Sequence, residues 1–192
     1  MTVASSVEQL SGSLRGQLIQ PSDPEYEEAR RVYNGMIDRR PRLVARCADA
    51  ADVIAAVNFA RENGLVTAIR GGGHNVAGFG TVDDGIVIDL SGMRSVRVDP
   101  ANRTVRAEGG CTWGDVDHAA YAFGLAVPCG IISTTGVAGL TLGGGTGYLT
   151  RKYGLTVDNL ISVEVVTADG SLVTASVEEN EDLFWAIRGG EG

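Results

Sequence analysis

The run Arg70-Gly71-Gly72-Gly73-His74-Asn75 combines three consecutive glycines with the nucleophilic side chain of His74. Because glycine has no Cβ, successive backbone N–H groups in such a run can point into one concavity, which is how a pyrophosphate is held. The spacing matches neither the Walker pattern, since no Lys-Ser/Thr follows, nor the Rossmann pattern, whose glycines are spaced differently. A tight surface turn capped by His74 is an equally good interpretation of these residues alone.

A second stretch, residues 134–149, holds seven glycine or alanine residues among sixteen. So little side-chain volume predicts backbone pressed against a flat, polar-edged ligand, with Thr134 and Thr135 as hydrogen-bond donors. The alternative is a flexible loop, but the interleaved apolar residues Val137 and Leu140 argue against disorder.

Alternating strand and helix patterns before residue 91 should position the first run. A helix capped by Asp49 is expected to end at Asn63-Gly64, because apolar residues recur along it at helical spacing. Strands are expected at residues 43–45, 66–69 and 85–90. This order predicts a right-handed parallel unit, with the glycine run where a strand ends, the place where open α/β sheets bind ligands.

The pattern changes after Ser91. Residues 96–98 with 105–107, and 161–167 with 172–174, predict two hairpins. Helices are expected at residues 113–123, with Thr112 as the cap, and at 181–187. Together with short helices before residue 38, this predicts an N-terminal helical segment at 1–37 and a domain at 38–192, with lobes at 38–93 and 94–192.

Charge and composition exclude several classes of function. Twenty-four acidic residues against 16 basic ones give a net charge of −8, which argues against nucleic acid as a partner, because phosphate binding needs a concentrated basic face. Three cysteines and two histidines form no close pairing, so no metal site is expected and a reduced, cytoplasmic setting is the simplest interpretation. We find no export signal and no membrane-spanning stretch, and we therefore expect no membrane partner.

Three separated motifs, in order, resemble the FAD-linked oxidases. They are residues 69–75, residues 143–159, and the C-terminal run at 182–190. The resemblance covers nearly everything from Pro41 onward. Within the family, the sequence is most similar to the berberine-bridge-enzyme-like branch, which includes 6-hydroxynicotine oxidases and oligosaccharide oxidases. A match of three motifs in order is far more specific than any single glycine run.

This resemblance implies an α+β fold of the vanillyl-alcohol-oxidase type, also called a PCMH-type FAD-binding domain. Its two lobes, a small parallel α/β lobe and a larger antiparallel sheet lobe flanked by helices, would both contact the cofactor. His74 matches the family's flavinylated histidine, so the FAD is expected to be covalently attached there, and a neutral imidazole is a suitable nucleophile near pH 7. The expected FAD-contacting residues are Arg70, Gly71, Gly72, Gly73, His74, Asn75, Gly78, Thr134, Thr135, Gly136, Gly139, Gly144, Gly145, Gly147, Leu149 and Asn159.

Two departures from the family pattern matter. Many relatives attach the flavin a second time through a cysteine, but the matching position here is Ile132, and Cys129 lies three residues too early. We therefore expect a single attachment, with Cys129 as a structural thiol and His118 as a solvated surface histidine. The family's substrate-binding domain and its catalytic residues lie beyond the segment that matches, so that domain is taken as absent from this chain and no catalytic residue is assigned.

The resemblance implies an oxidoreductase of the oxidase class. A full-length relative would pass a hydride from a substrate C–H next to oxygen or nitrogen to flavin N5, with O₂ as acceptor and a small molecule as substrate. An alternative is a truncated, non-catalytic module that folds but binds FAD weakly or not at all, with a homo-oligomer over its exposed domain face left open. A third interpretation is a phosphate-sugar or nucleotide-binding protein that shares only the loop.

Overall fold

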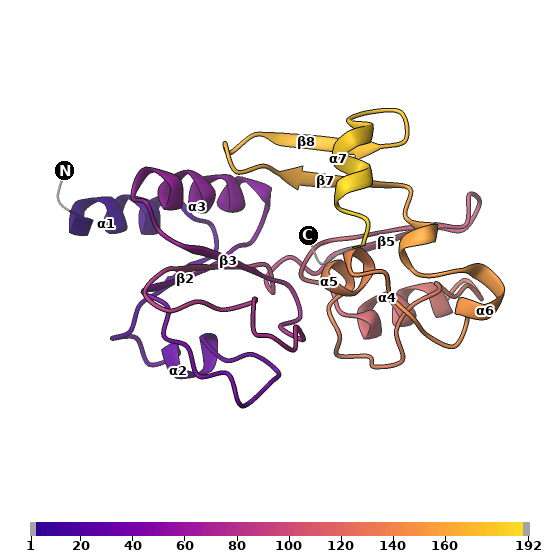
Figure 1. The fold of residues 1–192 in the computed structure, drawn as a ribbon, viewed down its shortest axis with the longest axis horizontal. Helices are drawn as coiled ribbons and strands as arrows, with labels where there is room; N and C mark the ends of the chain where they lie inside the picture. The colour runs from indigo at the N-terminus through magenta and orange to yellow at the C-terminus, as the bar shows by residue number, and fades with distance from the viewer. Residues whose placement is uncertain (1–2, 190–192) are drawn as a thin grey trace. The chain divides into compact units, whose positions relative to one another are not determined.

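The computed structural model describes residues 3–189, and the chain divides into two compact units (Figure 1). The first unit consists of residues 1–93 and 165–173, and the second of residues 94–164 and 174–192. The chain therefore passes from one unit to the other three times. The fold is α+β, with the parallel strands in the first unit and the β5-β6 hairpin in the second.

A single four-stranded sheet forms the centre of the first unit, in the order β1-β2-β4-β3. Strands β2, β4 and β3 are parallel, and β1 joins the edge antiparallel to β2. The elements are α1 (Val3–Ser13), β1 (Gln17–Ile19), α2 (Tyr26–Ala29), β2 (Leu43–Arg46), α3 (Ala50–Glu62), β3 (Thr67–Arg70) and β4 (Ile86–Asp89).

Both faces of this sheet are buried, which explains the continuous apolar runs in its central strands. On β4, Ile86 and Ile88 belong to a cluster with Phe59 of α3 and Leu10 of α1. Val87, between them, faces the opposite side and packs with residues of α2. Figure 1 shows α1 and α3 on one side of these strands and α2 on the other.

Helix α3 begins and ends where the sequence predicts. The Asp49 side chain accepts hydrogen bonds from the N–H groups of Ala51 and Asp52, which is a standard N-cap. The helix ends at Glu62, and Gly64 follows in the left-handed region with φ 62°. No helix within residues 3–189 is long and apolar enough to cross a membrane.

The second unit is built from short helices and two-stranded sheets. Strands β5 and β6 pair antiparallel, and β7 and β8 form a separate two-stranded sheet whose turn belongs to the first unit. The elements are β5 (Val96–Asp99), β6 (Thr104–Ala107), α4 (Trp113–Tyr121), α5 (Val137–Leu142), α6 (Thr150–Tyr153), a 3-10 turn (Val157–Asn159), β7 (Ser162–Val166), β8 (Leu172–Ser176) and α7 (Glu181–Ala186).

The N-terminal region differs from the predicted helical segment at 1–37. Leu18 and Ile19 lie in β1 and pair with β2, because burying both side chains against the sheet outweighs a weak helical pattern. Of the short helices expected before residue 38, α1 is present, and the other is only the single turn α2. Residues 1–37 are therefore part of the first unit, and residues 165–173, expected in the second lobe, belong to the first unit as well.

Candidate functional site

The first glycine run leaves the carboxyl end of β3, at the edge of the parallel sheet. Gly73 adopts φ 69°, a conformation that favours glycine. Within residues 3–189, no hydrogen bond is found for the backbone N–H groups of Gly71, Gly72 and Gly73. These three consecutive donors can bind a ligand, and an anion with several oxygen acceptors is the chemical group that suits them.

Arg70, at the head of this run, has a structural role that the sequence did not indicate. Its side chain is 7% exposed, and the guanidinium donates to the carboxylate of Asp89 (3.0 Å) and the carbonyl of Ala29 (2.6 Å). A further bond reaches the carbonyl of Arg31. The side chain is therefore held in the protein interior, so the predicted contact of Arg70 with the cofactor would have to come from its backbone.

Residues 33–39, here called the N-terminal segment, donate hydrogen bonds to backbone carbonyl groups of residues 71–81, here called the glycine loop. The guanidinium of Arg39 donates to the carbonyls of Gly78 (3.0 Å) and Thr81 (2.8 Å). The amide of Asn34 donates to the carbonyl of Val76, and the N–H of Tyr33 donates to the carbonyl of Gly73. The loop's shape is thus fixed mainly through its backbone.

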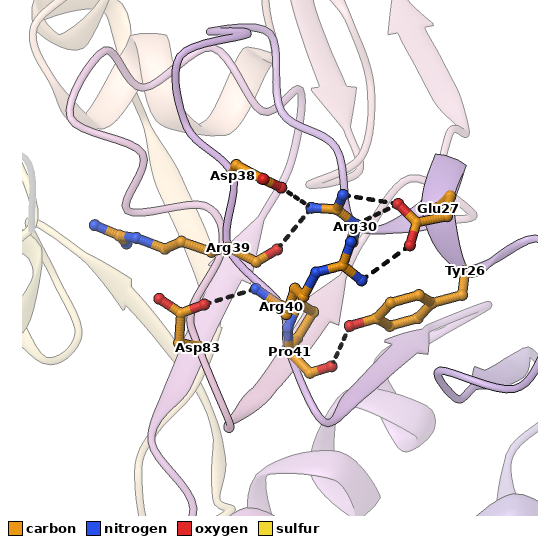
Figure 2. A network of polar contacts seen from close by, with 8 residues as sticks. All are labelled: Tyr26, Glu27, Arg30, Asp38, Arg39, Arg40, Pro41 and Asp83. Atoms are coloured by element: carbon orange, nitrogen blue, oxygen red, sulfur yellow. Dashed lines mark hydrogen bonds and ion pairs between the residues drawn. The ribbon is translucent and has the colours of Figure 1, made fainter.

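An ion-pair network in turn fixes the backbone of Arg39 (Figure 2). Arg30 lies between Glu27 and Asp38, with both carboxylates in contact with its guanidinium, and it also donates to the carbonyl of Arg39. Figure 2 shows the Arg39 side chain pointing away from this network, and its guanidinium is free to bond the loop carbonyls. The N-terminal segment therefore positions the candidate site.

Two further predicted residues act within the loop. Asn75 accepts from the N–H of Phe79 through its side chain and from the N–H of Gly78 through its carbonyl, which closes a turn. Gly78 has φ 78°, and a Cβ there would lie 2.8 Å from Ile37. Local packing therefore explains both residues without a ligand.

His74 follows the three glycines, is partly buried, and stacks on the ring of Tyr33. The ring centroids are 4.1 Å apart and the planes are inclined by 16°. The two residues are 41 positions apart in the sequence and meet because the loop and the N-terminal segment are hydrogen-bonded to each other.

In the second unit, residues 133–137 run beside residues 111–114. Gly136 forms an antiparallel bridge with Thr112, and Trp113 donates to the carbonyl of Thr135. Thr112 begins α4 with a capping box closed by Asp115, as the sequence predicts for the cap. This pairing holds the segment that contains Thr134 and Thr135.

The backbone conformation or the close packing at positions 144, 145 and 147 favours glycine. Gly144 and Gly145 have φ 106° and 76°, and a Cβ at Gly145 would lie 2.4 Å from the Thr156 hydroxyl. A Cβ at Gly147 would lie 1.7 Å from the carbonyl oxygen of Cys129. These positions therefore mark close packing, and the glycine pattern alone does not establish a ligand there.

Gly139 differs from these glycines, because a Cβ there would have no neighbour within 4 Å. It lies in α5, so the stretch predicted as a ligand-facing wall contains a short helix. The other two predicted residues support the local fold: Leu149 precedes α6, and the Asn159 amide donates to the carbonyls of Tyr153 and Leu155.

Burial disfavours the thiolate, the nucleophilic form, of all three cysteines. Burial, together with nearby carboxylates, raises the pKa of the Cys47 thiol to about 12, and burial raises that of Cys111. Burial and the charge of Asp117 raise the pKa of Cys129 to about 11. All three are free thiols, and His118 is exposed as expected.

Sequence reasoning missed the residues that position the loop, namely Tyr33, Asn34 and Arg39. Tyr33 and Asn34 lie in the segment expected to be helical, Arg39 follows it, and each of the three contacts a residue about 40 positions away. Only the dipeptide Tyr33-Asn34 next to Gly35, a poor helix sequence, signals an irregular structure there.

Comparison with known proteins identifies the family to which the chain belongs. Residues 41–176 match the FAD binding domain family. The (R)-6-hydroxynicotine oxidase of Paenarthrobacter nicotinovorans is 42% identical over 177 residues, which cover 92% of this chain and 39% of that protein.

Solved structures agree with this match. The crystal structure of 6-hydroxy-D-nicotine oxidase from Arthrobacter nicotinovorans is similar with a TM-score of 0.91 at 42% identity, covering 93% of this chain and 39% of that one. BBE-like 1 of Physcomitrella patens gives a TM-score of 0.90 at 33% identity, covering 96% and 40%. The chain thus spans about 40% of the length of the relatives it matches.

Proposed function

Because this chain belongs to the FAD binding domain family of FAD-linked oxidoreductases, in the 6-hydroxynicotine-oxidase and berberine-bridge-enzyme-like branch, we propose that its glycine loop binds the FAD pyrophosphate. The observation that carries the proposal is the row of N–H groups at Gly71, Gly72 and Gly73, which donate to nothing else in the described chain. No acidic residue lies between Arg70 and Val82. The donors and the local charge therefore fit a dianionic diphosphate.

His74 is the proposed point of covalent attachment. His74 would hold the flavin through a ring nitrogen on the 8α-carbon; replacing one C–H and one N–H bond by this C–N bond releases two protons and two electrons, which O₂ would take up as hydrogen peroxide. The high pKa of Cys129 leaves it almost entirely as the thiol near neutral pH, which supports a single attachment.

Residues of the second unit are proposed to contact FAD as well. Gly139 is the strongest of these, because the space beside its Cα is open. Thr134, Thr135 and Gly136 are held in place by their pairing with residues 111–114.

Bound FAD would supply hydride acceptance at N5, and the proposed reaction is oxidation of a small-molecule C–H next to oxygen or nitrogen with O₂ as acceptor. The chain's own residues bind and orient the cofactor. We propose a cytoplasmic location.

The test begins with the product of the full gene, purified after growth with riboflavin. Acid-precipitated protein is expected to stay yellow, and mass spectrometry should find an FAD adduct on the peptide that contains His74. His74→Ala should release all of its flavin into the supernatant. Free flavin from the wild type would contradict covalent attachment but not FAD binding.

Gly72→Val tests the phosphate site against a matched control. The new side chain would block approach to the N–H groups, so FAD content should fall at least about tenfold while the circular dichroism spectrum is kept. Gly12→Val is the control, since a Cβ at that position has no neighbour within 4 Å. Full FAD content in Gly72→Val would reject the phosphate site.

A further inference from the structure

Tyr33 lies where its ring can set the orientation of His74. The two rings are stacked with centroids 4.1 Å apart and 16° between their planes. Tyr33 is nevertheless 72% exposed, so burial of its own ring does not account for its position. Ring pairs of this kind contribute about 0.5–1.5 kcal/mol beyond the area they bury.

Backbone contacts on both sides of His74 keep the two rings together. The N–H of Tyr33 donates to the carbonyl of Gly73 (3.0 Å), the residue before His74. The side-chain amide of Asn34 donates through its nitrogen to the carbonyl of Val76 (2.9 Å), two residues after His74. Its Oδ1 accepts from the N–H of Met36 (3.1 Å). These hydrogen bonds hold Tyr33 beside His74 in the loop.

The stack with Tyr33 covers one face of the His74 imidazole and restrains the plane of its ring. A ring nitrogen forms a new bond along its lone pair, which lies in the plane of the ring. Fixing that plane therefore fixes the direction in which a nitrogen of His74 can bond, and misplacement by about 1 Å can slow a reaction about 100-fold.

We propose that Tyr33 is a positioning residue for flavin attachment: its ring holds the His74 imidazole in the plane that presents a nitrogen to the 8α-carbon. The proposal rests on the function proposed above. Its role requires the aromatic ring and does not require the phenolic hydroxyl.

The stack itself is tested without any cofactor. The chain has two histidines, His74 and His118, so their ring C–H resonances can be assigned with His74→Ala. The ring current of Tyr33 should shift the His74 resonances upfield, and Tyr33→Ala should abolish that shift while His118 stays unchanged. Tyr33→Phe should keep it. Identical His74 resonances in the wild type and Tyr33→Ala would overturn the proposal.

Attachment is tested with the full gene product made in riboflavin-depleted cells and then incubated with FAD in air. Covalent flavin in acid-precipitated protein should form about 10- to 100-fold more slowly in Tyr33→Ala than in wild type. Total bound FAD should stay the same, and Tyr33→Phe should attach flavin at the wild-type rate. Tyr121→Ala, which removes a tyrosine that is 84% exposed, is the control.

The outcomes separate the two proposals. Attachment at the wild-type rate in Tyr33→Ala would overturn the positioning role and leave the attachment site standing. Loss of total FAD binding in both Tyr33→Ala and Tyr33→Phe would also overturn the positioning role, because the hydroxyl would then matter for binding. Covalent flavin in His74→Ala would instead contradict the attachment site on which both proposals stand.

Discussion

At the scale of single residues, burial controls the chemistry of the thiols. Cys47 and Cys111 are fully buried, and burial raises the pKa of Cys47 to about 12 and that of Cys129 to about 11. Since the thiolate is the reactive form, we expect native protein to react slowly with Ellman's reagent at pH 8, and all three thiols to react in denaturant. Rapid labelling of one native thiol would contradict this. Non-reducing gels should show no disulfide-linked species.

Asp52 links the start of the chain to α3. Its carboxylate is 1% exposed and accepts from the N–H groups of Ala48, Arg15 and Gly16. Burial opposes ionisation, but these donors prevail and hold the pKa of Asp52 below its ordinary 3.8. The stabilisation is therefore full above that pH and is lost as the pH falls through the folded-state pKa.

We expect Asp52→Asn to lower the free energy of unfolding by about 1–3 kcal/mol at pH 7, because an amide cannot accept all three bonds. Urea denaturation at pH 7 and at pH 3 measures the effect, which should shrink at the lower pH. Asp23→Asn, in an exposed turn, is the control. An equal loss at both pH values would contradict the role of the charge.

The sequence predicts His74 and the glycines as site residues but does not predict the contacts that position them. Local spacing places the run at a strand end, because hydrophobic periodicity fixes the strands. The partners of Arg70 and His74 depend on tertiary packing: Asp89 lies on a neighbouring strand, and Tyr33 lies in a segment without regular structure. No pattern of nearby residues encodes such pairs.

At the scale of elements, two glycines of the second unit make a matched pair. A Cβ at Gly147 would meet the carbonyl of Cys129 at 1.7 Å, whereas one at Gly139 would meet nothing within 4 Å. We expect Gly147→Ala to destabilise the protein by about 1–3 kcal/mol. Gly139→Ala, in helix α5, should stabilise it by up to about 1 kcal/mol.

Urea denaturation of the two variants checks the stabilities, and FAD titration adds a second measurement. If Gly139 faces the flavin, Gly139→Ala should weaken FAD binding while it raises stability. Unchanged FAD affinity would remove Gly139 from the proposed site.

Predictions of helix ends were correct where a capping residue next to the helix determines the boundary. Asp49 and Gly64 bound α3, and Thr112 begins α4, because capping is a property of adjacent residues. Element predictions failed for β1, whose three residues are stabilised by pairing with β2, and for α5, because its glycines masked a short helix that begins at Val137.

At the scale of the whole molecule, the chain returns to the first unit for only nine residues, 165–173. There the carbonyl of Ala168 accepts from Arg61 of α3, and a Cβ at Gly170 would lie 2.3 Å from the Asn58 side chain. This turn anchors a hairpin whose strands continue into the second unit.

We expect Gly170→Ala to cost about 1 kcal/mol more stability than Gly124→Ala. Both positions have positive φ, 86° and 65°, so both substitutions carry similar backbone strain. Only Gly170 also meets a side chain, since a Cβ at Gly124 has no neighbour within 4 Å. Thermal unfolding of the two variants measures the difference, and equal losses would show that the Asn58 contact contributes nothing.

The way the glycine loop is held has a consequence for protein engineering. Its shape depends on carbonyl groups, those of Gly73, Val76, Gly78 and Thr81, and these are present whatever side chain the residue carries. Val76 and Phe79 have exposed side chains, 82% and 64%. A combinatorial library randomised at these two positions should therefore consist mostly of folded members, and new surface chemistry could be selected beside the loop without rebuilding its backbone.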